Sequence, residues 1–252
     1  MLTLHALTTG YRHTIISRNL NATLSQGTLT ALLGTNGAGK STLLRTLARF
    51  QPPLAGSISW QGTDTALLSA RQLARTMSVV LTFKPEAEAL TAAEVVEMGR
   101  IPYTTMLSGT SEADRQAVEQ AMQLTHTTPF ANRPISTLSD GERQRVFIAK
   151  ALAQNTPVIL LDEPTAFLDF PAKIATMRLL KKLAHDAQKT ILLSTHDVEL
   201  ALHMADNLWL LNQQTLTSGS PQLLAANGCI SRFFNTEGVQ FDAATMRFDM
   251  RG

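Results

Sequence analysis

A glycine-rich segment at residues 34–42 carries the strongest chemical signal in the chain. It follows the apolar run at 28–33 and has the spacing G-x-x-x-x-G-K-[ST]. Between a strand and a helix this spacing predicts a phosphate-binding loop, because glycines let successive backbone N–H groups form a nest for anionic oxygens at the helix N-terminus. The residues expected to line the loop are Gly34, Thr35, Asn36, Gly37, Ala38, Gly39, Lys40, Ser41 and Thr42.

Three side chains at the end of the loop are expected to divide the contacts to a bound nucleotide. Lys40 would place a positive charge at the β- and γ-phosphates, the Ser41 hydroxyl would ligate Mg²⁺, and Thr42 would contact phosphate. The alternative is a glycine-rich turn that merely links a strand to a helix. It requires the motif, its context and the partner motifs to be accidents, so phosphate binding is the stronger interpretation.

Two carboxylates follow a second apolar run, at residues 158–161. Asp162 is placed to hold the Mg²⁺ of a bound nucleotide, as a strand-end acid does in this class of phosphate site. Glu163 could polarise a water molecule for in-line attack on the γ-phosphate, acting as a general base. The alternative is a hydrated Asp-Glu turn before Pro164, and the phosphate loop upstream makes that alternative the weaker one.

A third motif, at residues 138–145, stands just before a helix with apolar periodicity. Ser139 and Gly141 at a helix start can bind an anion through the same N–H groups and helix dipole as the first loop. A chain with one nucleotide pocket has no evident use for a second anion site. Two copies related by a twofold axis do, because each would offer this turn to the other's γ-phosphate. Without the other motifs, an ordinary capped helix would be the better interpretation.

The pattern of the whole chain predicts the elements that must position these residues. Residues 1–33 alternate apolar and polar positions, which is typical of strands and turns. Further along, strands alternate with helices, which predicts a parallel sheet covered on both faces, with nucleotide at the carboxyl ends of its strands. We expect strands near 57–60, 77–81, 158–161, 190–194 and 208–211, helices near 69–75, 172–187 and 197–204, and capping-box helix starts at 91–94, 111–114 and 139–142.

Composition and charge narrow the functional classes. With 252 residues and 17% charged residues, the chain is globular in type and long enough for one domain or two. A net charge of +2, with no basic run longer than Lys181-Lys182, gives no electrostatic footprint for nucleic acid. The single cysteine, Cys229, cannot form an internal disulfide, which suits a reducing compartment. No signal peptide is evident, and the apolar runs fall far short of the ~20 residues that span a bilayer, so any membrane role is expected to be peripheral.

In their order and spacing, these motifs resemble those of the ATPase subunits of the ATP-binding cassette (ABC) transporter family, and the match covers residues 1 to about 220. The resemblance implies an α/β P-loop NTPase cassette with a mainly parallel sheet core, an N-terminal antiparallel β part and a helical subdomain inserted at about 86–155. It implies ATP and Mg²⁺ as ligands, with ATP hydrolysis coupled to transmembrane transport. Residues 221–252 form a C-terminal extension to which the sequence assigns no role.

The same resemblance assigns roles to further residues. Tyr11 matches the aromatic residue that stacks on adenine, and the turn at 139–144 matches the family signature. Asp169 ends the segment that matches the dimer-contacting loop, and His196 matches the switch histidine that hydrogen-bonds the γ-phosphate. Taken singly, Tyr11 and His196 would more often be structural residues, so their roles depend on the resemblance.

Two departures from the family pattern bear on mechanism. Thr82 stands where the family usually has a glutamine that reaches the Mg²⁺ and the attacking water. Because threonine is shorter by about two bonds, we expect a bridging water molecule to give Thr82 its catalytic part. In the signature, Asp140 and Glu142 replace the commoner glycine and glutamine. The acid at 140 affects the expected backbone geometry, whereas the contacts of Ser139 and Gly141 are retained.

Within the family, residues 90–103 resemble the corresponding segment of importers for iron-siderophore, haem and cobalamin. This implies a homodimer beneath a pair of polytopic membrane permease subunits, with an extracytoplasmic substrate-binding protein that delivers the chelate. The subunit is then peripheral, at the cytoplasmic face of the inner (plasma) membrane. Residues 82–105 are expected to form the groove that receives a permease helix.

Two other functional classes stay open at this point. A soluble ABC ATPase in cofactor assembly, such as iron-sulfur cluster biogenesis, would bind protein scaffolds and no permease. An ABC protein that acts on nucleic acid or ribosomes usually has two cassettes or long coiled-coil insertions, and the sequence has neither. The sequence therefore favours transport and predicts no nucleic-acid partner, but it does not name the chelate.

Overall fold

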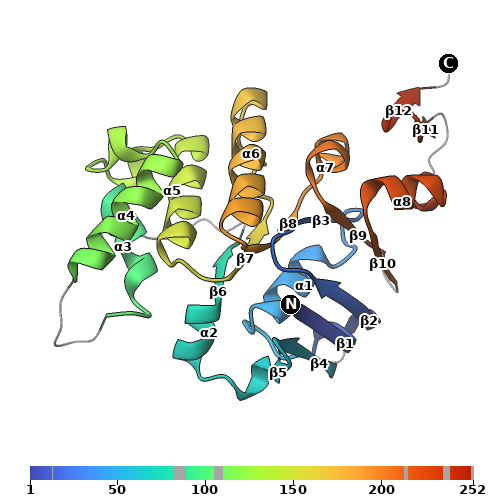
Figure 1. Ribbon diagram of the computed structural model, residues 1–252, viewed down its shortest axis with the longest axis horizontal. Helices are drawn as coiled ribbons and strands as arrows, with labels where there is room; N and C mark the ends of the chain where they lie inside the picture. Colours follow the sequence, from blue (N-terminus) through green and yellow to red (C-terminus); the bar gives the residue numbers. More distant parts are fainter. Residues whose placement is uncertain (13, 82–88, 105–109, 213–214, 235–238, 251–252) are drawn as a thin grey trace. The chain divides into compact units, whose positions relative to one another are not determined.

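The computed structural model describes residues 1–12, 14–81, 89–104, 110–212, 215–234 and 239–250. The chain divides into two compact units, one made of Met1–Ala66 with Lys181–Gly252 and the other of Leu67–Leu180 (Figure 1). Thr82 lies outside the described residues. Within the described ranges, no helix combines the length and the apolar character that crossing a membrane requires.

The first unit begins with an antiparallel sheet, which confirms the predicted N-terminal β part. Along β1, Leu2 and Leu4 are both buried, as alternate residues are when one face of a strand covers a core. Leu2 lies opposite Leu24 and Leu4 opposite Ile58, so apolar side chains from neighbouring strands meet on that face. The strand order is β2-β1-β4-β5, with β1 at Leu2–Tyr11, β2 at Thr14–Leu24, β4 at Ala55–Trp60 and β5 at Thr63–Asp64.

Parallel strands in the same unit carry the phosphate loop. Strand β3 (Leu29–Leu33) runs parallel to both of its neighbours, β8 (Thr190–Ser194) and β9 (Asn207–Leu211). Every residue of β3 and β8 is buried, as expected for strands covered on both faces. Strand β10 (Leu216–Gly219) pairs with β9 in the antiparallel sense.

The remaining elements of the first unit are short. Strands β11 and β12 form a separate two-stranded sheet near the C-terminus (Figure 1). Four phenylalanine rings connect the end of α9 with this hairpin. Phe233 contacts Phe234, Phe234 contacts Phe248, and Phe248 contacts Phe241. The elements are α1 (Lys40–Leu47), α7 (Val198–Met204), α8 (Pro221–Ala226), α9 (Cys229–Phe233), β11 (Val239–Asp242) and β12 (Arg247–Met250).

The second unit is mainly helical between two parallel strands. Strand β6 (Met77–Val80) pairs with β7 (Val158–Asp162). The described residues between them form three α-helices around an apolar core that includes Val96, Val118 and Val146. Helix α6 (Phe170–Asp186) follows β7. The other elements are α2 (Ala70–Thr76), α3 (Ala92–Glu97), η2 (Met98–Arg100), α4 (Glu112–Leu124), η3 (Thr128–Phe130), η4 (Ile135–Thr137) and α5 (Asp140–Ala153).

The predicted helix starts are confirmed by their hydrogen bonds. Thr91, Ser111 and Ser139 each form a complete capping box with the acid three residues on, and Ser69 does the same with a glutamine at the start of α2. In each box the cap side chain accepts from the N–H three residues on, whose side chain bonds back to the N–H of the cap. These starts depend on four consecutive residues, so the sequence alone could locate them.

Candidate nucleotide site

The phosphate loop joins β3 to α1, and Lys40 is folded back across it. Its Nζ donates hydrogen bonds to the carbonyl oxygens of Gly34 at 2.8 Å and Thr35 at 3.3 Å. Only 6% of Lys40 is exposed. A positive charge is therefore held inside the loop, where the nest of N–H groups would receive an anion.

Glycines set the concave shape of this loop. Gly37 and Gly39 have φ angles of +78° and +97°, a conformation that residues with a side chain disfavour. A Cβ on Gly39 would lie 2.5 Å from Cγ2 of Ile16, so this position has no room for a larger residue. Gly39 also caps α1 without a side-chain hydrogen bond. The cap residue therefore does not compete with an anion for the first N–H groups of α1, and the loop fits a phosphate group.

Tyr11, at the end of β1, is tied to the same loop. Its phenolic oxygen accepts a hydrogen bond from Oγ1 of Thr42 at 3.3 Å, while 46% of Tyr11 stays exposed. An exposed aromatic ring beside a phosphate loop can stack on a nucleotide base. The sequence did not foresee this bond, because it joins residues that are 31 positions apart.

His196 follows the strand next to the one that precedes the loop. Strands β3 and β8 are parallel, with Leu32 opposite Ser194, so the chain continues from the same sheet edge to Gly34 in one case and to His196 in the other. The N–H of Thr195 donates to the carbonyl oxygen of Leu32 at 3.3 Å, which fixes the start of the turn. His196 itself is exposed.

The two predicted carboxylates belong to the second unit, at the end of β7. All five residues of this strand are buried, and Asp162 is 5% exposed. Glu163 has a φ of +50°, in the left-handed region that non-glycine residues rarely adopt. The N–H of Ala166 donates to the carbonyl oxygen of Glu163 at 3.2 Å and closes the turn. Other non-glycine residues of the chain, such as Asn19 and Gln188, have similar φ angles, so the role of Glu163 depends on its place after Asp162 and not on its backbone conformation.

The predicted signature turn, before α5, is closed on itself. The Glu142 carboxylate Oε2 accepts hydrogen bonds from the Ser139 N–H at 2.9 Å and the Ser139 hydroxyl at 3.0 Å. Chiefly the bond from the Ser139 N–H holds the pKa of Glu142 below its ordinary value, with a smaller contribution from the charge of Arg133, whose Nη1 lies 3.4 Å from Oε1. This turn therefore already holds an anion of its own.

The signature turn and the predicted dimer-contacting loop lie side by side in one chain. A Cβ on Gly141 would be 3.3 Å from the carbonyl oxygen of Phe167. Asp169, at the end of that loop, accepts a hydrogen bond on Oδ1 from the N–H of Ala172 at 2.9 Å and so caps α6. The sequence placed both segments at helix starts but gave no sign that they contact each other.

The predicted site residues thus fall into two groups. The first unit holds Tyr11, residues 34–42 and His196, and the second holds Asp162, Glu163, Ser139, Gly141 and Asp169. Thr82 lies outside the described residues, so its role stays a prediction. Within the units, contacts join Thr42 with Tyr11 and the segment of Gly141 with that of Phe167.

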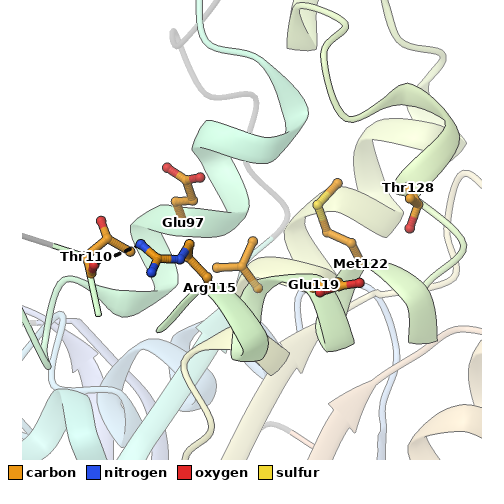
Figure 2. A pocket seen from close by; sticks show the side chains of 7 residues that line it. Glu97, Thr110, Arg115, Glu119, Met122 and Thr128 are labelled. Atoms are coloured by element: carbon orange, nitrogen blue, oxygen red, sulfur yellow. Dashed lines mark hydrogen bonds between the residues drawn. The ribbon is translucent and has the colours of Figure 1, made fainter. Parts of the chain in front are cut away.

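Figure 2 shows a cavity of about 230 Å³ among the helices of the second unit. Arg115 points along its wall and donates a hydrogen bond from Nη1 to the carbonyl oxygen of Thr110 at 3.3 Å. None of the residues expected to contact nucleotide lines this cavity, so it is not part of the candidate nucleotide site. Its lining residues are Glu97, Thr110, Arg115, Val118, Glu119, Met122 and Thr128.

Comparison with known sequences places these motifs in a family. The family model described as ABC transporter matches residues 17–166, well over half of the chain. The chain is 38% identical to the achromobactin transport ATP-binding protein of Dickeya dadantii, over 94% of this chain and 88% of that protein. It is 39% identical to the petrobactin import ATP-binding protein of Bacillus anthracis, over 92% and 85%. With the ferric enterobactin transport ATP-binding protein of Escherichia coli the identity is 34%, over 94% and 88%.

Solved structures agree with this placement. A dimeric bacterial ABC transporter cassette superposes with a TM-score of 0.78 at 30% identity, over 88% of this chain and 99% of that one. A metal-chelate type ABC transporter in an inward-facing conformation superposes with a TM-score of 0.80 at 29% identity, over 93% and 88%. The fold is that of an ATP-binding cassette, as the resemblance implied. The chain belongs to the ABC transporter family.

Proposed function

We propose that this chain is the ATP-binding and hydrolysing subunit that powers import of a metal chelate, of the iron-siderophore, haem or cobalamin type, through a membrane permease. The observation that carries the proposal is the phosphate loop, in which the buried Lys40 Nζ is held 2.8 Å from the carbonyl oxygen of Gly34. The names of the relatives, which refer to achromobactin, petrobactin and ferric enterobactin, support a metal chelate as cargo. They also favour transport over cofactor assembly.

In this proposal the first unit binds the nucleotide. The ring of Tyr11 stacks on adenine, and the N–H groups of residues 34–42 together with the Lys40 ammonium bind the β- and γ-phosphates. His196 donates a hydrogen bond to a γ-phosphate oxygen. The hydrogen bond from Thr42 to Tyr11 gives the base-binding and phosphate-binding ends of the site a fixed connection within the first unit.

The chemistry of the side chains also fits Mg²⁺. The Ser41 hydroxyl is exposed at the start of α1, and the Asp162 carboxylate ends β7, so both offer the oxygen ligands that Mg²⁺ prefers. When bound, the ion would offset charge on the phosphate oxygens. Glu163 accepts a proton from the attacking water, and Thr82 orients that water through a bridging water molecule.

Hydrolysis in this proposal requires two copies of the chain. Ser139 and Gly141 of one copy contact the γ-phosphate held by the other, and Asp169 lies in the loop at the dimer contact. The contact between the segments of Gly141 and Phe167 supports a single dimer-facing surface on the second unit. The dimeric cassette among the structural relatives supports the same arrangement.

The proposed assembly places the chain at the cytoplasmic face of the inner (plasma) membrane. There it binds polytopic permease subunits through a groove at residues 82–105, and an extracytoplasmic binding protein supplies the chelate. We place the ATPase domain at 1–220, with its helical subdomain at about 86–155, and a C-terminal extension at 221–252.

The proposal is tested by reconstituting the chain with its permease subunits in liposomes and measuring ATPase activity with a panel of ferric siderophores, haem and cobalamin. One chelate class, delivered by its binding protein, should raise the ATPase rate above the rate without chelate, and the same class should accumulate inside. An unchanged rate and no uptake across the whole panel, in a complex that hydrolyses ATP, would reject the metal-chelate assignment.

A further inference from the structure

Two arginines of helix α2 donate hydrogen bonds to the turn at residues 101–104 of the second unit. No residue of this helix is buried, and Arg71 and Arg75 lie four residues apart on the same exposed face. The Nε of Arg71 donates to the carbonyl oxygen of Pro102 at 2.9 Å, and the Nε of Arg75 donates to the same oxygen at 3.0 Å. Arg71 also donates from Nη2 to the carbonyl oxygen of Thr104 at 3.2 Å.

The aromatic residue of the turn contacts two guanidinium groups. The Cζ atom of Arg100 lies 4.0 Å and that of Arg75 lies 5.0 Å from the ring centroid of Tyr103, within the range of cation–π contacts. The turn thus fixes the position of Arg75 through one carbonyl and one ring. It fixes Arg71 through two carbonyls.

The arginines around the turn differ in whether a carboxylate pairs with them. Arg100 is balanced by Asp114, whose Oδ1 lies 2.8 Å from Nε. For Arg71 and Arg75, the part of the chain that the structure describes supplies neutral carbonyls and an aromatic ring, and no carboxylate within ion-pair distance. Two fixed positive charges on an exposed helix therefore lack a counter-charge there.

Two exposed apolar side chains belong to the same turn and to the short helix before it. Ile101, directly before Pro102, is 61% exposed, and Met98, the first residue of η2, is 38% exposed. We call the set Arg71, Arg75, Met98, Ile101 and Tyr103 the α2 arginine surface. It combines cationic donors with exposed aliphatic atoms, and interfaces use such combinations more than isolated charges.

A guanidinium has five N–H donors in a rigid fork, and the contacts above use two from Arg71 and one from Arg75. The other donors suit bidentate binding of a carboxylate. Because the turn already holds both side chains, binding such a partner costs less side-chain entropy than it would with mobile arginines. The surface fits an acidic segment with an apolar neighbour and disfavours a basic one.

We propose that the α2 arginine surface binds an acidic segment of the permease, with a carboxylate on Arg71 and Arg75 and an apolar side chain against Ile101. This rests on the proposed transport function and adds the chemistry of the partner. In this proposal the positive charges that recognise the permease are those of Arg71 and Arg75 on α2. This helix precedes the predicted groove at 82–105 in the sequence.

The test is co-purification of the detergent-solubilised complex after co-expression of the chain with its permease subunits. In the double variant Arg71→Gln/Arg75→Gln, recovery with the permease should fall at least about tenfold at moderate salt, because the carboxylate loses both partners. The ATPase rate of the isolated chain should stay at the wild-type value, and a single cooperative thermal transition should show that the variant is folded. Arg115→Gln is the matched control, since Arg115 is exposed in the same unit but paired with Glu112 at 2.6 Å, and it should leave recovery unchanged.

A charge-exchange experiment completes the test. Arg71→Glu/Arg75→Glu should abolish assembly, and Lys substituted for one acidic residue of a cytoplasmic permease loop should restore it. Wild-type recovery of both double variants would overturn the α2 arginine surface while leaving the transport function intact. Absence of any complex between the wild-type chain and the permease, with ATPase activity retained, would overturn the transport function and this surface with it.

Discussion

The two helix starts expected to bind phosphate, at α1 and α5, differ in how their N-termini are satisfied. Helix α1 begins after Gly39, has no side-chain cap and carries no acid in its first turn. Helix α5 begins after Ser139, has a complete capping box and carries two acids in its first turn, Asp140 and Glu142. The first start is open to an external anion, whereas the second already uses the N–H and the hydroxyl of Ser139 on the carboxylate of Glu142.

We propose that this difference assigns the two sites to different stages of the reaction. An open N-terminus can bind phosphate in a single chain, because its N–H groups are not committed to a side chain. A self-capped N-terminus must exchange its own carboxylate for the phosphate of another molecule. Helix α4 provides a third case for comparison, since Ser111 and Asp114 form a capping box that has no proposed ligand.

The largest effect is expected at Glu163, the proposed general base. Glu163→Gln keeps the shape of the side chain but removes the base, so the ATPase rate should fall by about 10²- to 10⁴-fold while MgATP still binds. Light scattering should then show a dimer with MgATP and a monomer with MgADP. A Gln variant that hydrolyses ATP at the wild-type rate would show that Glu163 is not the base.

The capping box of α4, which has no proposed ligand, is expected to affect the free energy of unfolding. Asp114→Asn leaves the guanidinium of Arg100 without its carboxylate, so the free energy of unfolding should fall by about 3 kcal/mol. The Ser111 hydroxyl, followed by Arg100, lowers the pKa of Asp114 from 3.8 to about 2. Because the folded-state pKa is the lower one, the stabilisation is complete above pH 4 and is lost as pH falls through about 2.

Urea unfolding of wild type and Asp114→Asn at several pH values checks this. The difference in unfolding free energy should be largest near neutral pH and should narrow below pH 4. A difference that does not change with pH would mean that the charge of Asp114 contributes nothing to stability.

The contrast between the two anion sites is tested most directly by Lys40→Ala and Ser139→Ala. Removing the Lys40 charge should weaken ATP binding by the isolated chain by about 10- to 100-fold, the value of one hydrogen bond to a charged group. Ser139→Ala should leave that affinity unchanged and reduce only ATP-driven dimerisation. The ATP affinity of the isolated chain is measured by calorimetry. An equal loss of that affinity in both variants would contradict the proposal that the two sites act at different stages.

A smaller effect is expected from the charge in the self-capped turn. Glu142→Gln can keep the capping box, since glutamine also serves at this position, but it removes a negative charge where a γ-phosphate would arrive. MgATP-driven dimerisation, measured in the Glu163→Gln background, should strengthen by about 2- to 5-fold. Asp140→Asn is the control, because it removes a charge from the same first turn at a residue that takes no part in the capping box. Weaker dimerisation in Glu142→Gln would contradict the exchange of anions.

The smallest effect concerns Thr82. A glutamine there could reach the ion and the attacking water directly, so Thr82→Gln should raise the basal ATPase rate and reduce its dependence on the permease. Thr82→Val, which lacks the hydroxyl, should lower the rate. Identical rates for all three proteins, with and without permease, would leave Thr82 as a groove residue without a catalytic part.

The sequence by itself determined the features that depend on neighbouring residues. The phosphate loop, the strand-end acids and the capping boxes at 91, 111 and 139 each use contacts within a few positions, so residue type and spacing were enough to locate them. The order of these motifs also identified the family. Strand β10 and the C-terminal hairpin gave no comparable local signal and were not predicted.

Only the tertiary structure decided which of these features contact one another. The hydrogen bond from Thr42 to Tyr11, the approach of Gly141 to Phe167 and the meeting of Arg71 with Pro102 join residues far apart in the chain. Such contacts depend on strand register and helix packing, which no short pattern encodes.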